Sequence, residues 1–257
     1  MMKSLSVLAI FSFSLPLLLS AQERITDTDR ARSVFEEVEE RRASISTEQT
    51  DMEMVITNSS GNTRTRSMVL YNRFEGDDSE SLILFSAPAN VAGTGFLTIN
   101  EGDDRLQRLY LPSVGRVQTI TSSQRGDRFM GSDFTYEDLG NQQADDYEFE
   151  WMETHDAFYL IRARALDSNQ YTHVEFEIDR ERYTLLQIRY YADSEEPIKR
   201  LEAEDFEQIT DRLWSPKTMT MYDLRNDRFT TITWTNREIN GSIPDWRFTE
   251  RGLRRGL

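Results

Sequence analysis

The side chains best suited to acid–base chemistry or metal binding are few in this chain. His155 and His173 are its two histidines, and neither belongs to an H-x-x-x-H pair or to another metal-ligand spacing. His155 falls in a turn and His173 on the charged face of a predicted strand, so we expect both at the surface. The chain has no cysteine and no G-x-S-x-G motif, which removes the usual thiol and serine nucleophiles. We therefore predict no catalytic residue, no metal site and no cofactor.

Two other patterns could be mistaken for catalytic ones. Asp and Glu number 45, which invites a glycosidase interpretation, but they mostly fall in turns and at polar strand positions, where carboxylates are hydrated. Gly93-Thr94-Gly95 is similar to a phosphate-binding loop, but it lacks the lysine and the following helix that such a loop needs. A turn before a strand at 96–99 explains it better. We expect that the chain is not an enzyme.

A period of two dominates the hydrophobic pattern after residue 43. Five stretches alternate apolar with polar or charged side chains, and their apolar members are Met52, Met54 and Ile56; Tyr147, Phe149 and Trp151; Val174, Phe176 and Ile178; Met219 and Met221; and Ile232 and Trp234. Such alternation is typical of antiparallel strands with one apolar and one hydrated face. Turn residues separate these stretches, and we expect about eleven strands.

One helix is expected near the N-terminus, over residues 27–43. Ala31, Val34, Phe35 and Val38 recur at i, i+3, i+4 and i+7, which places them on one apolar stripe. Glutamates occupy the rest of the surface. The stripe predicts that this helix packs against the apolar face of the sheet.

The predicted elements imply an architecture. A twisted sheet of about ten or more strands tends to curl. One helix of about four turns is ~25 Å long and cannot cover its apolar face. The sequence therefore predicts a mainly β fold, with a curled antiparallel sheet forming an incomplete (half) barrel around an apolar hollow. The helix and the loops at 87–94 and 122–141 would form the lid.

Apolar side chains of these elements are the candidate ligand-binding residues. We assign Met54, Trp151, Phe176, Met221 and Trp234 to the hollow, and Phe35, Met130, Phe134 and Tyr136 to the lid. Methionine suits surfaces that accept varied apolar shapes. Ser132, Asp133 and Asp138 are expected to bond to backbone amides, as polar loop residues usually do.

Strand 158–165 leaves one question open. Ala163 and Ala165 share a face with Ile161 and would leave space within the sheet. Arg162 and Arg164 lie on the opposite face with Leu160. The sequence alone does not determine which face meets the ligand, so either arginine remains a candidate.

The N-terminus indicates export. Lys3 precedes an apolar run at 5–19 that is short for a membrane span, and Leu19-Ser20-Ala21 offers the small residues that a signal peptidase reads. We predict a signal peptide at 1–21, cleavage before Gln22, and a single periplasmic domain at 22–257. No other stretch is apolar enough to span a membrane. Without cysteine, there is no site for N-terminal acylation of a lipoprotein.

The charge of the chain restricts its partners. The net charge is −15, and removal of the predicted signal peptide, which carries Lys3 and no acid, leaves −16. Such a charge opposes binding to nucleic acids and to anionic lipid surfaces. It favours a soluble monomer that is attracted to basic surfaces.

Six segments, taken in order, resemble the outer-membrane lipoprotein-sorting (LolA-like) family of bacterial periplasmic proteins. They are FSAPANVAGTGFL, LYLPSVGRV, RFMGSDFTYEDL, VEFEIDRERYTLLQIRYY, LWSPKTMTMYDL and IPDWRFTERGL. The resemblance implies a half-barrel that carries lipoprotein acyl chains or another lipid. It also implies a link to an inner-membrane exporter of the resistance-nodulation-division type.

Two functions remain open from the sequence. The first is a periplasmic carrier or sensor that binds lipid-like ligands in the hollow and aids lipoprotein sorting or lipid export. The alternative is a non-enzymatic accessory module that docks on a membrane exporter complex and carries no lipid. Lipid that co-purifies with the protein would distinguish them.

Overall fold

A computed structural model describes residues 26–76, 78–102, 104–140, 143–168 and 170–256. The predicted signal peptide at 1–21 and the cleavage site before Gln22 lie outside these residues.

Helix α1 spans Asp27–Arg42 and confirms the helix expected from the apolar stripe. Thr26 caps its N-terminus in a capping box with Asp29, and Arg41 and Arg42 lie in the last turn, where basic side chains favour the helix dipole. Ala31, Val34 and Phe35 are buried. The stripe therefore faces the sheet, as predicted.

Thirteen strands in the described residues form one antiparallel sheet. Their bounds are β1 Thr47–Thr57, β2 Thr63–Glu75, β3 Asp78–Ala87, β4 Gly95–Glu101, β5 Asp104–Leu111, β6 Arg116–Thr119, β7 Tyr147–Thr154, β8 Phe158–Ala165, β9 His173–Asp179, β10 Leu185–Tyr191, β11 Lys199–Gln208, β12 Trp214–Asp223 and β13 Arg228–Ile239. The order across the sheet is β6-β5-β4-β3-β2-β1-β13-β12-β11-β10-β9-β8-β7. The first and last strands thus pair at its centre, and hairpins extend outward from them on both sides.

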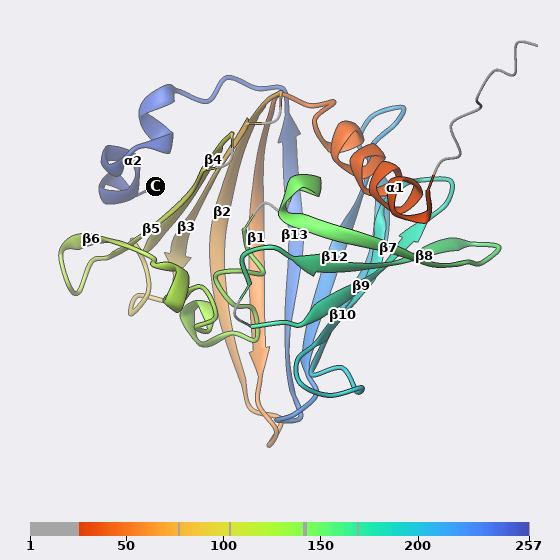
Figure 1. Cartoon of the computed structure of the whole chain (residues 1–257). Coiled ribbons are helices and arrows are strands. Elements are labelled where there is room, and N and C mark those ends of the chain that lie inside the picture. The colour runs from red at the N-terminus through yellow and green to blue at the C-terminus, as the bar shows by residue number, and fades with distance from the viewer. Residues whose placement is uncertain (1–25, 77, 103, 141–142, 169, 257) are drawn as a thin grey trace, which may run out of the picture.

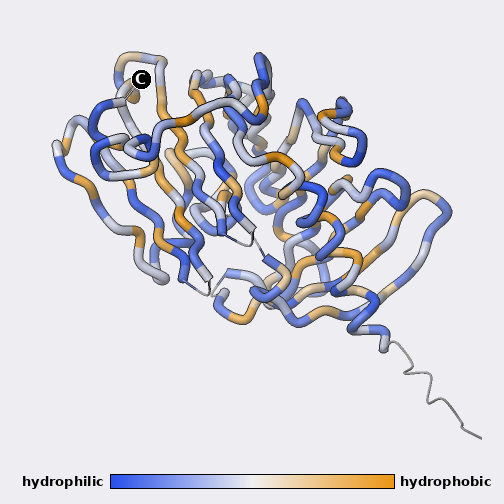
Figure 2. Tube along the Cα trace, turned by 90° about the horizontal axis from the view of Figure 1, so that it is seen from above, coloured by the Kyte–Doolittle hydropathy of each residue, from blue (hydrophilic) through white to orange (hydrophobic). Residues whose placement is uncertain are grey.

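The sheet curls without closing, which confirms the predicted incomplete barrel (Figure 1). Seen from above, hydrophobic and hydrophilic stretches alternate along the strands (Figure 2). The expectation of about eleven strands was too low. Strand β6 shows why, since its four residues Arg-Val-Gln-Thr contain a single apolar side chain and carry no readable alternation.

The two edge strands, β6 and β7, are consecutive in the chain although they lie at opposite ends of the sheet. The chain between them must therefore pass from one edge to the other. We call residues 120–140 and 143–146 the crossing segment; it contains the short helices η1 Ser122–Gln124, η2 Phe129–Gly131 and η3 Ala144–Asp146. It passes in front of the concave face (Figure 1). The strand order itself thus supplies a cover for the hollow.

The convex face has a second, smaller core. Helix α2 (Glu250–Arg255) and η4 (Asp245–Phe248) place Leu253 and Phe248 against Tyr71, Leu82, Leu84 and Leu97. This explains the unbroken apolar run Leu82–Phe85, which is buried on both faces of β3. Gly95 allows the close approach, because a Cβ at this position would lie 2.9 Å from Leu253 Cδ2.

Among the described residues, no helix is long and apolar enough to cross a membrane.

Candidate ligand-binding hollow

The concave face encloses an apolar cavity of about 400 Å³. Strands β1–β4 and β9–β13 contribute to its wall. The apolar lining includes Met52 of β1, Leu70 of β2, Ile83 of β3, Phe176 and Ile178 of β9, Leu185 and Ile188 of β10, Leu201 of β11, Met219 of β12, and Ile232 and Trp234 of β13. Helix α1 adds Phe35 and Val38, and the crossing segment adds Phe134 and Leu139. The helix and the crossing segment therefore cover part of the chamber.

Four of the nine residues assigned from the sequence lie on the wall of this cavity. Phe176 and Trp234 line it from the sheet, and Phe35 and Phe134 line it from the lid. The Phe35 ring packs 5.3 Å, centroid to centroid, from that of Phe176 and 5.2 Å from that of Phe149. This contact holds α1 over the β7–β9 end of the sheet. A role for these residues in ligand binding stays a prediction.

The other five residues lie elsewhere in or near the main core. Met54 and Met221 are 1% and 0% exposed and pack within it, away from the cavity wall. Trp151 lies on edge strand β7, where the Arg30 guanidinium stacks 3.8 Å from its ring centroid. Tyr136 packs against Phe96 and Phe129, and Met130 is half-buried against the same core.

Sequence reasoning missed several lining residues that share a face with those it named. Met52 precedes Met54 by two residues, and Met219 precedes Met221 by two. The alternation identified the correct face. It does not show where along a strand the cavity lies, so it could not tell which methionine of each pair lines the cavity. The loop at 87–94 supplies no lining residue, so its predicted role as a lid is wrong. It packs Val91 against the core instead.

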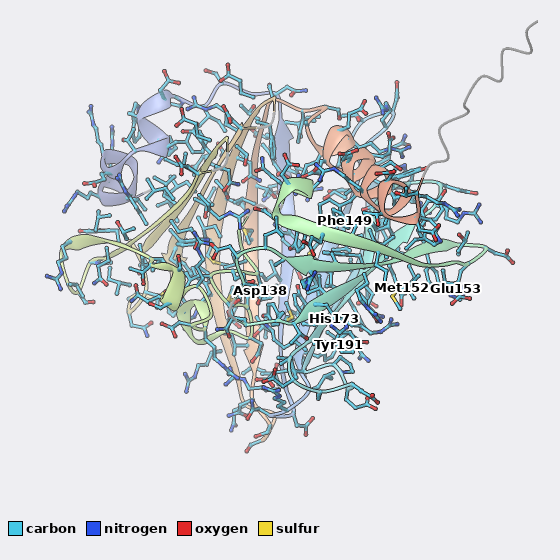
Figure 3. The ribbon with its side chains drawn as sticks, viewed as in Figure 1. Asp138, Phe149, Met152, Glu153, His173 and Tyr191 are labelled. Carbon is cyan, nitrogen blue, oxygen red and sulfur yellow. The ribbon has the colours of Figure 1, made fainter. Side chains whose placement is uncertain are left out.

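Asp138 anchors the crossing segment to the sheet through a buried ion pair. Its Oδ2 lies 2.5 Å from Lys199 Nζ of β11 and accepts a hydrogen bond from the Thr135 amide at 2.7 Å. Its Oδ1 accepts a hydrogen bond from the Tyr171 hydroxyl at 2.9 Å. Figure 3 shows Asp138 on the crossing segment in front of the sheet. The expected amide bond is present, but the stronger partner is a lysine 61 residues away.

Asp133 forms a second anchor, which joins the crossing segment to the start of β13. Its side chain is fully buried, with Oδ1 2.6 Å from Arg228 Nε and Oδ2 accepting from the Thr230 hydroxyl at 2.7 Å. Ser132 donates to the Phe129 carbonyl at 2.7 Å, so it bonds to a carbonyl and not to an amide as expected. These contacts fix the segment that carries Phe134.

Arg162 and Arg164 point away from the hollow, which answers the question left open by the sequence. Arg162 pairs with Glu150 and Glu175, and Arg164 pairs with Glu148. Ile161 and Ala163, with the opposite parity, are fully buried in the main core. Both arginines thus belong to a charged network on the convex face.

Glu175 occupies a polar position of strand β9, where carboxylates were expected to be hydrated, but it is buried. Its side chain is 9% exposed, because Arg162 and Arg189 cover it and the Tyr191 hydroxyl donates to it at 2.9 Å. Both histidines are half-buried at the surface. His173 stacks on Tyr191 with centroids 4.4 Å apart, and burial lowers its pKa. Figure 3 shows these two side by side, and Phe149, Met152 and Glu153 along edge strand β7.

The end of the cavity near the C-terminus of α1 is polar. Glu39, Arg42, Glu48 and Arg237 line it there. Arg237 lies 2.7 Å from both Glu48 and Glu207. Burial raises the pKa of Glu39 to about 7, an effect that Arg42 and a hydrogen bond from the Ala144 amide only partly oppose.

A polar cleft of about 890 Å³ continues beyond Glu39 and Arg42. It lies between α1, the turns that follow β2 and β4, and the end of the crossing segment. It shares Glu39, Arg42, Phe74, Ser79 and Asn100 with the cavity. In the described part of the chain, no group of three or more His, Asp and Glu side chains could hold a metal ion. The site therefore consists of an apolar cavity and an adjoining polar cleft.

A protein family model described as "-like: Uncharacterized protein" matches residues 77–255, which is more than half of the chain. A solved domain from Vibrio parahaemolyticus, named for outer membrane lipoprotein sorting, is 26% identical, with a TM-score of 0.80 over 87% of this chain and 99% of that one. The chain therefore belongs to the family that this model describes, and its structure is similar to solved proteins of the outer-membrane lipoprotein-sorting, or LolA-like, superfamily. The resemblance seen in the six segments is thereby confirmed.

Two further solved structures share this LolA-like fold. A DUF1329 family protein from Desulfovibrio piger is 24% identical, with a TM-score of 0.81 and coverage of 88% of this chain and 99% of that one. A LolA superfamily protein from Nitrosomonas europaea is 18% identical, with a TM-score of 0.68 and coverage of 85% and 97%. No curated protein matches the chain. The match spans almost the full length of all three structures.

Proposed function

We propose that this LolA-like protein is a periplasmic carrier or sensor that binds an apolar or acylated ligand in its hollow, without catalysing a reaction. The observation that carries the proposal is the 400 Å³ apolar cavity roofed by α1 and the crossing segment. Similarity to a solved domain named for outer membrane lipoprotein sorting supports it.

The energetics of burial suit such a role. Each buried CH₂ contributes about 0.8 kcal/mol, so a chain of a dozen carbons gains on the order of 10 kcal/mol before the costs of association. No catalytic group is needed for that transfer. Release requires that the roof opens. The roof is joined to the sheet by polar contacts around Asp133 and Asp138 and by the buried rings of Phe129, Phe134 and Tyr136.

Binding of N-phenyl-1-naphthylamine, a neutral apolar fluorophore, to delipidated protein tests the proposal. We expect saturable binding with quenching of tryptophan fluorescence, since Trp214 and Trp234 line the cavity. Phe176→Glu should weaken binding at least tenfold, because it places a carboxylate in the apolar wall. Met219→Glu, at a half-buried lining position, is the second variant in case Phe176→Glu does not fold.

The control must be a carboxylate remote from the hollow. Glu148 is exposed on the convex face and pairs with Arg164, so Glu148→Gln should bind the fluorophore as the wild type does. Absence of binding to folded, delipidated wild-type protein would contradict the carrier. A docking module for a membrane exporter, with a hollow that takes no cargo, would then explain the chain better.

A further inference from the structure

The two compartments of the hollow differ in chemistry. The inner chamber of about 400 Å³ is lined mostly by apolar side chains, whereas the cleft of about 890 Å³ is lined mostly by charged and polar ones. Glu39 and Arg42 stand at the junction, since both compartments include them. A ligand that fills both must therefore have an apolar part and a polar part.

The volume of the inner chamber limits the apolar part. An apolar cavity of about 150 Å³ takes one benzene ring, so each carbon needs roughly 25 Å³. On that scale 400 Å³ holds about sixteen carbons, which corresponds to one long acyl chain or one fused-ring body. Two or three acyl chains would need a chamber two to three times larger. An acyl chain in the cleft would strip water from its ionic side chains, which opposes burial there.

The charge of the cleft restricts the polar part. Nine carboxylates and four guanidinium groups line it among the described residues, the carboxylates being Glu36, Glu39, Glu40, Asp78, Asp104, Glu137, Asp145, Asp146 and Asp167. Three of the arginines already have carboxylate partners there: Arg32 pairs with Glu36 and Asp145, Arg105 with Asp146, and Arg125 with Asp167. Arg42 lies near Glu39 and Glu48.

An anionic head group would meet this excess of negative charge. A carboxylate or phosphate would have to displace one of these ion pairs to find a cation, and like charges in a partly enclosed site repel. A hydroxyl-bearing or cationic head group would instead find many acceptor oxygens. Burial raises the pKa of Glu39 and of Glu137, so the inner part of the cleft is partly shielded from water, whereas its outer carboxylates are exposed.

We infer that the ligand is a single-tailed amphiphile of about sixteen apolar carbons whose head group carries no negative charge, with its tail in the inner chamber and its head in the cleft. The inference rests on the proposed carrier function and narrows it. It excludes a triacylated lipoprotein terminus and a free fatty acid as the preferred ligand.

Three ligands with the same sixteen-carbon chain test the inference: 1-monopalmitoylglycerol, palmitate and a tripalmitoylated lipopeptide. Their dissociation constants are measured on delipidated protein by displacement of N-phenyl-1-naphthylamine and by native mass spectrometry. We expect 1-monopalmitoylglycerol to bind at least tenfold more tightly than either of the others. Palmitate binding equally well would overturn the head-group part, and tighter binding of the lipopeptide would overturn the single-tail part. Failure of all three, with the fluorophore also unbound, would remove the carrier function itself.

Two double variants, each of which removes two negative charges, test whether the charge of the cleft selects the head group. Glu40→Gln with Asp104→Asn removes two negative charges from the cleft. It should reduce the ratio of the dissociation constants of palmitate and 1-monopalmitoylglycerol at least threefold. Glu148→Gln with Glu150→Gln removes two negative charges from the convex face, where both are exposed, and should leave the ratio unchanged. An equal response of the two variants would show that net charge, and not the cleft, selects the ligand.

Discussion

Lys199 Nζ lies 2.5 Å from Asp138 Oδ2, and this ion pair fastens the crossing segment to strand β11. The two side chains are 10% and 1% exposed, so water does little to screen or replace their attraction. Tyr171 bridges them, because its hydroxyl donates to Asp138 at 2.9 Å and accepts from Lys199 at 3.0 Å. Asp138 also lines the cavity, so the pair connects the roof of the hollow with its wall.

Removal of the Lys199 ammonium group should therefore lower the stability of the folded protein. Lys199→Met keeps most of the side-chain volume but leaves the Asp138 carboxylate buried without its counter-charge, and we expect the free energy of unfolding to fall by about 3–5 kcal/mol in urea titrations. The double variant with Asp138→Asn should recover a large part of that loss. Arg164→Met, which breaks the exposed pair with Glu148, should change stability by less than about 1 kcal/mol. Equal effects at Lys199 and Arg164 would show that the roof is not held by the buried pair.

The apolar stripe of α1 gives a second prediction. Phe35 is 7% exposed and contacts the rings of Tyr147, Phe149 and Phe176. Phe35→Asp buries an unpaired charge and empties this cluster, so we expect a loss of at least about 3 kcal/mol in thermal or urea unfolding. Ser33→Asp introduces the same side chain on the exposed face of the same helix and should cost less than about 0.5 kcal/mol. An unchanged melting temperature for Phe35→Asp would mean that the helix is not docked.

Glu39 predicts a dependence of stability on pH. Burial raises its pKa from 4.5 to about 7 in the folded protein. The folded state therefore binds this proton more tightly than the unfolded state does, and the resulting stability is fully present below pH 4.5 and is lost as the pH rises through 7. Because solvent still reaches the side chain, we expect the loss to be on the order of 1–2 kcal/mol, below the full value for such a pKa change.

Glu39→Gln should remove that loss. The variant should match the wild type in urea unfolding at pH 5 and exceed its stability at pH 8. Glu40 lies on the exposed surface of the same helix, so Glu40→Gln should respond to pH as the wild type does. A Glu39→Gln variant whose stability runs parallel to that of the wild type from pH 5 to pH 8 would show that the carboxyl is hydrated.

Gly95 gives a prediction for the convex face. A Cβ there would lie 2.9 Å from Leu253 Cδ2 and 3.1 Å from Leu84 Cδ2, so Gly95→Ala must push α2 away from β4. We expect a loss of about 1–3 kcal/mol from this overpacking. At Gly241, where an added Cβ meets no atom within 4 Å, the same substitution should be neutral or slightly stabilising. Equal unfolding midpoints for the two variants would refute close packing of α2.

The local sequence determined the type of most elements and the faces they bury. Period-two alternation in Met52–Ile56, Val174–Ile178 and Met219–Met221 specifies which side chains enter the core, because successive side chains of a strand point to opposite faces. The stripe Ala31–Val38 and the Thr26 capping box fix α1 in the same local way. The size of the sheet relative to a single helix then implied a curled, partly covered hollow.

Tertiary structure alone decided which residues meet across the fold. Alternation does not give depth, so Met52 and Met219 reach the cavity while Met54 and Met221 pack away from its wall. Glu175 looked hydrated in the sequence but is buried by arginines from two neighbouring strands. The Asp138–Lys199 pair joins residues 61 positions apart, and it forms because β6 and β7 lie at opposite edges of the sheet and the chain between them must cross it. Periodicity reflects the local geometry of one strand. Contacts between residues far apart in the sequence depend on how the strands are ordered in the sheet.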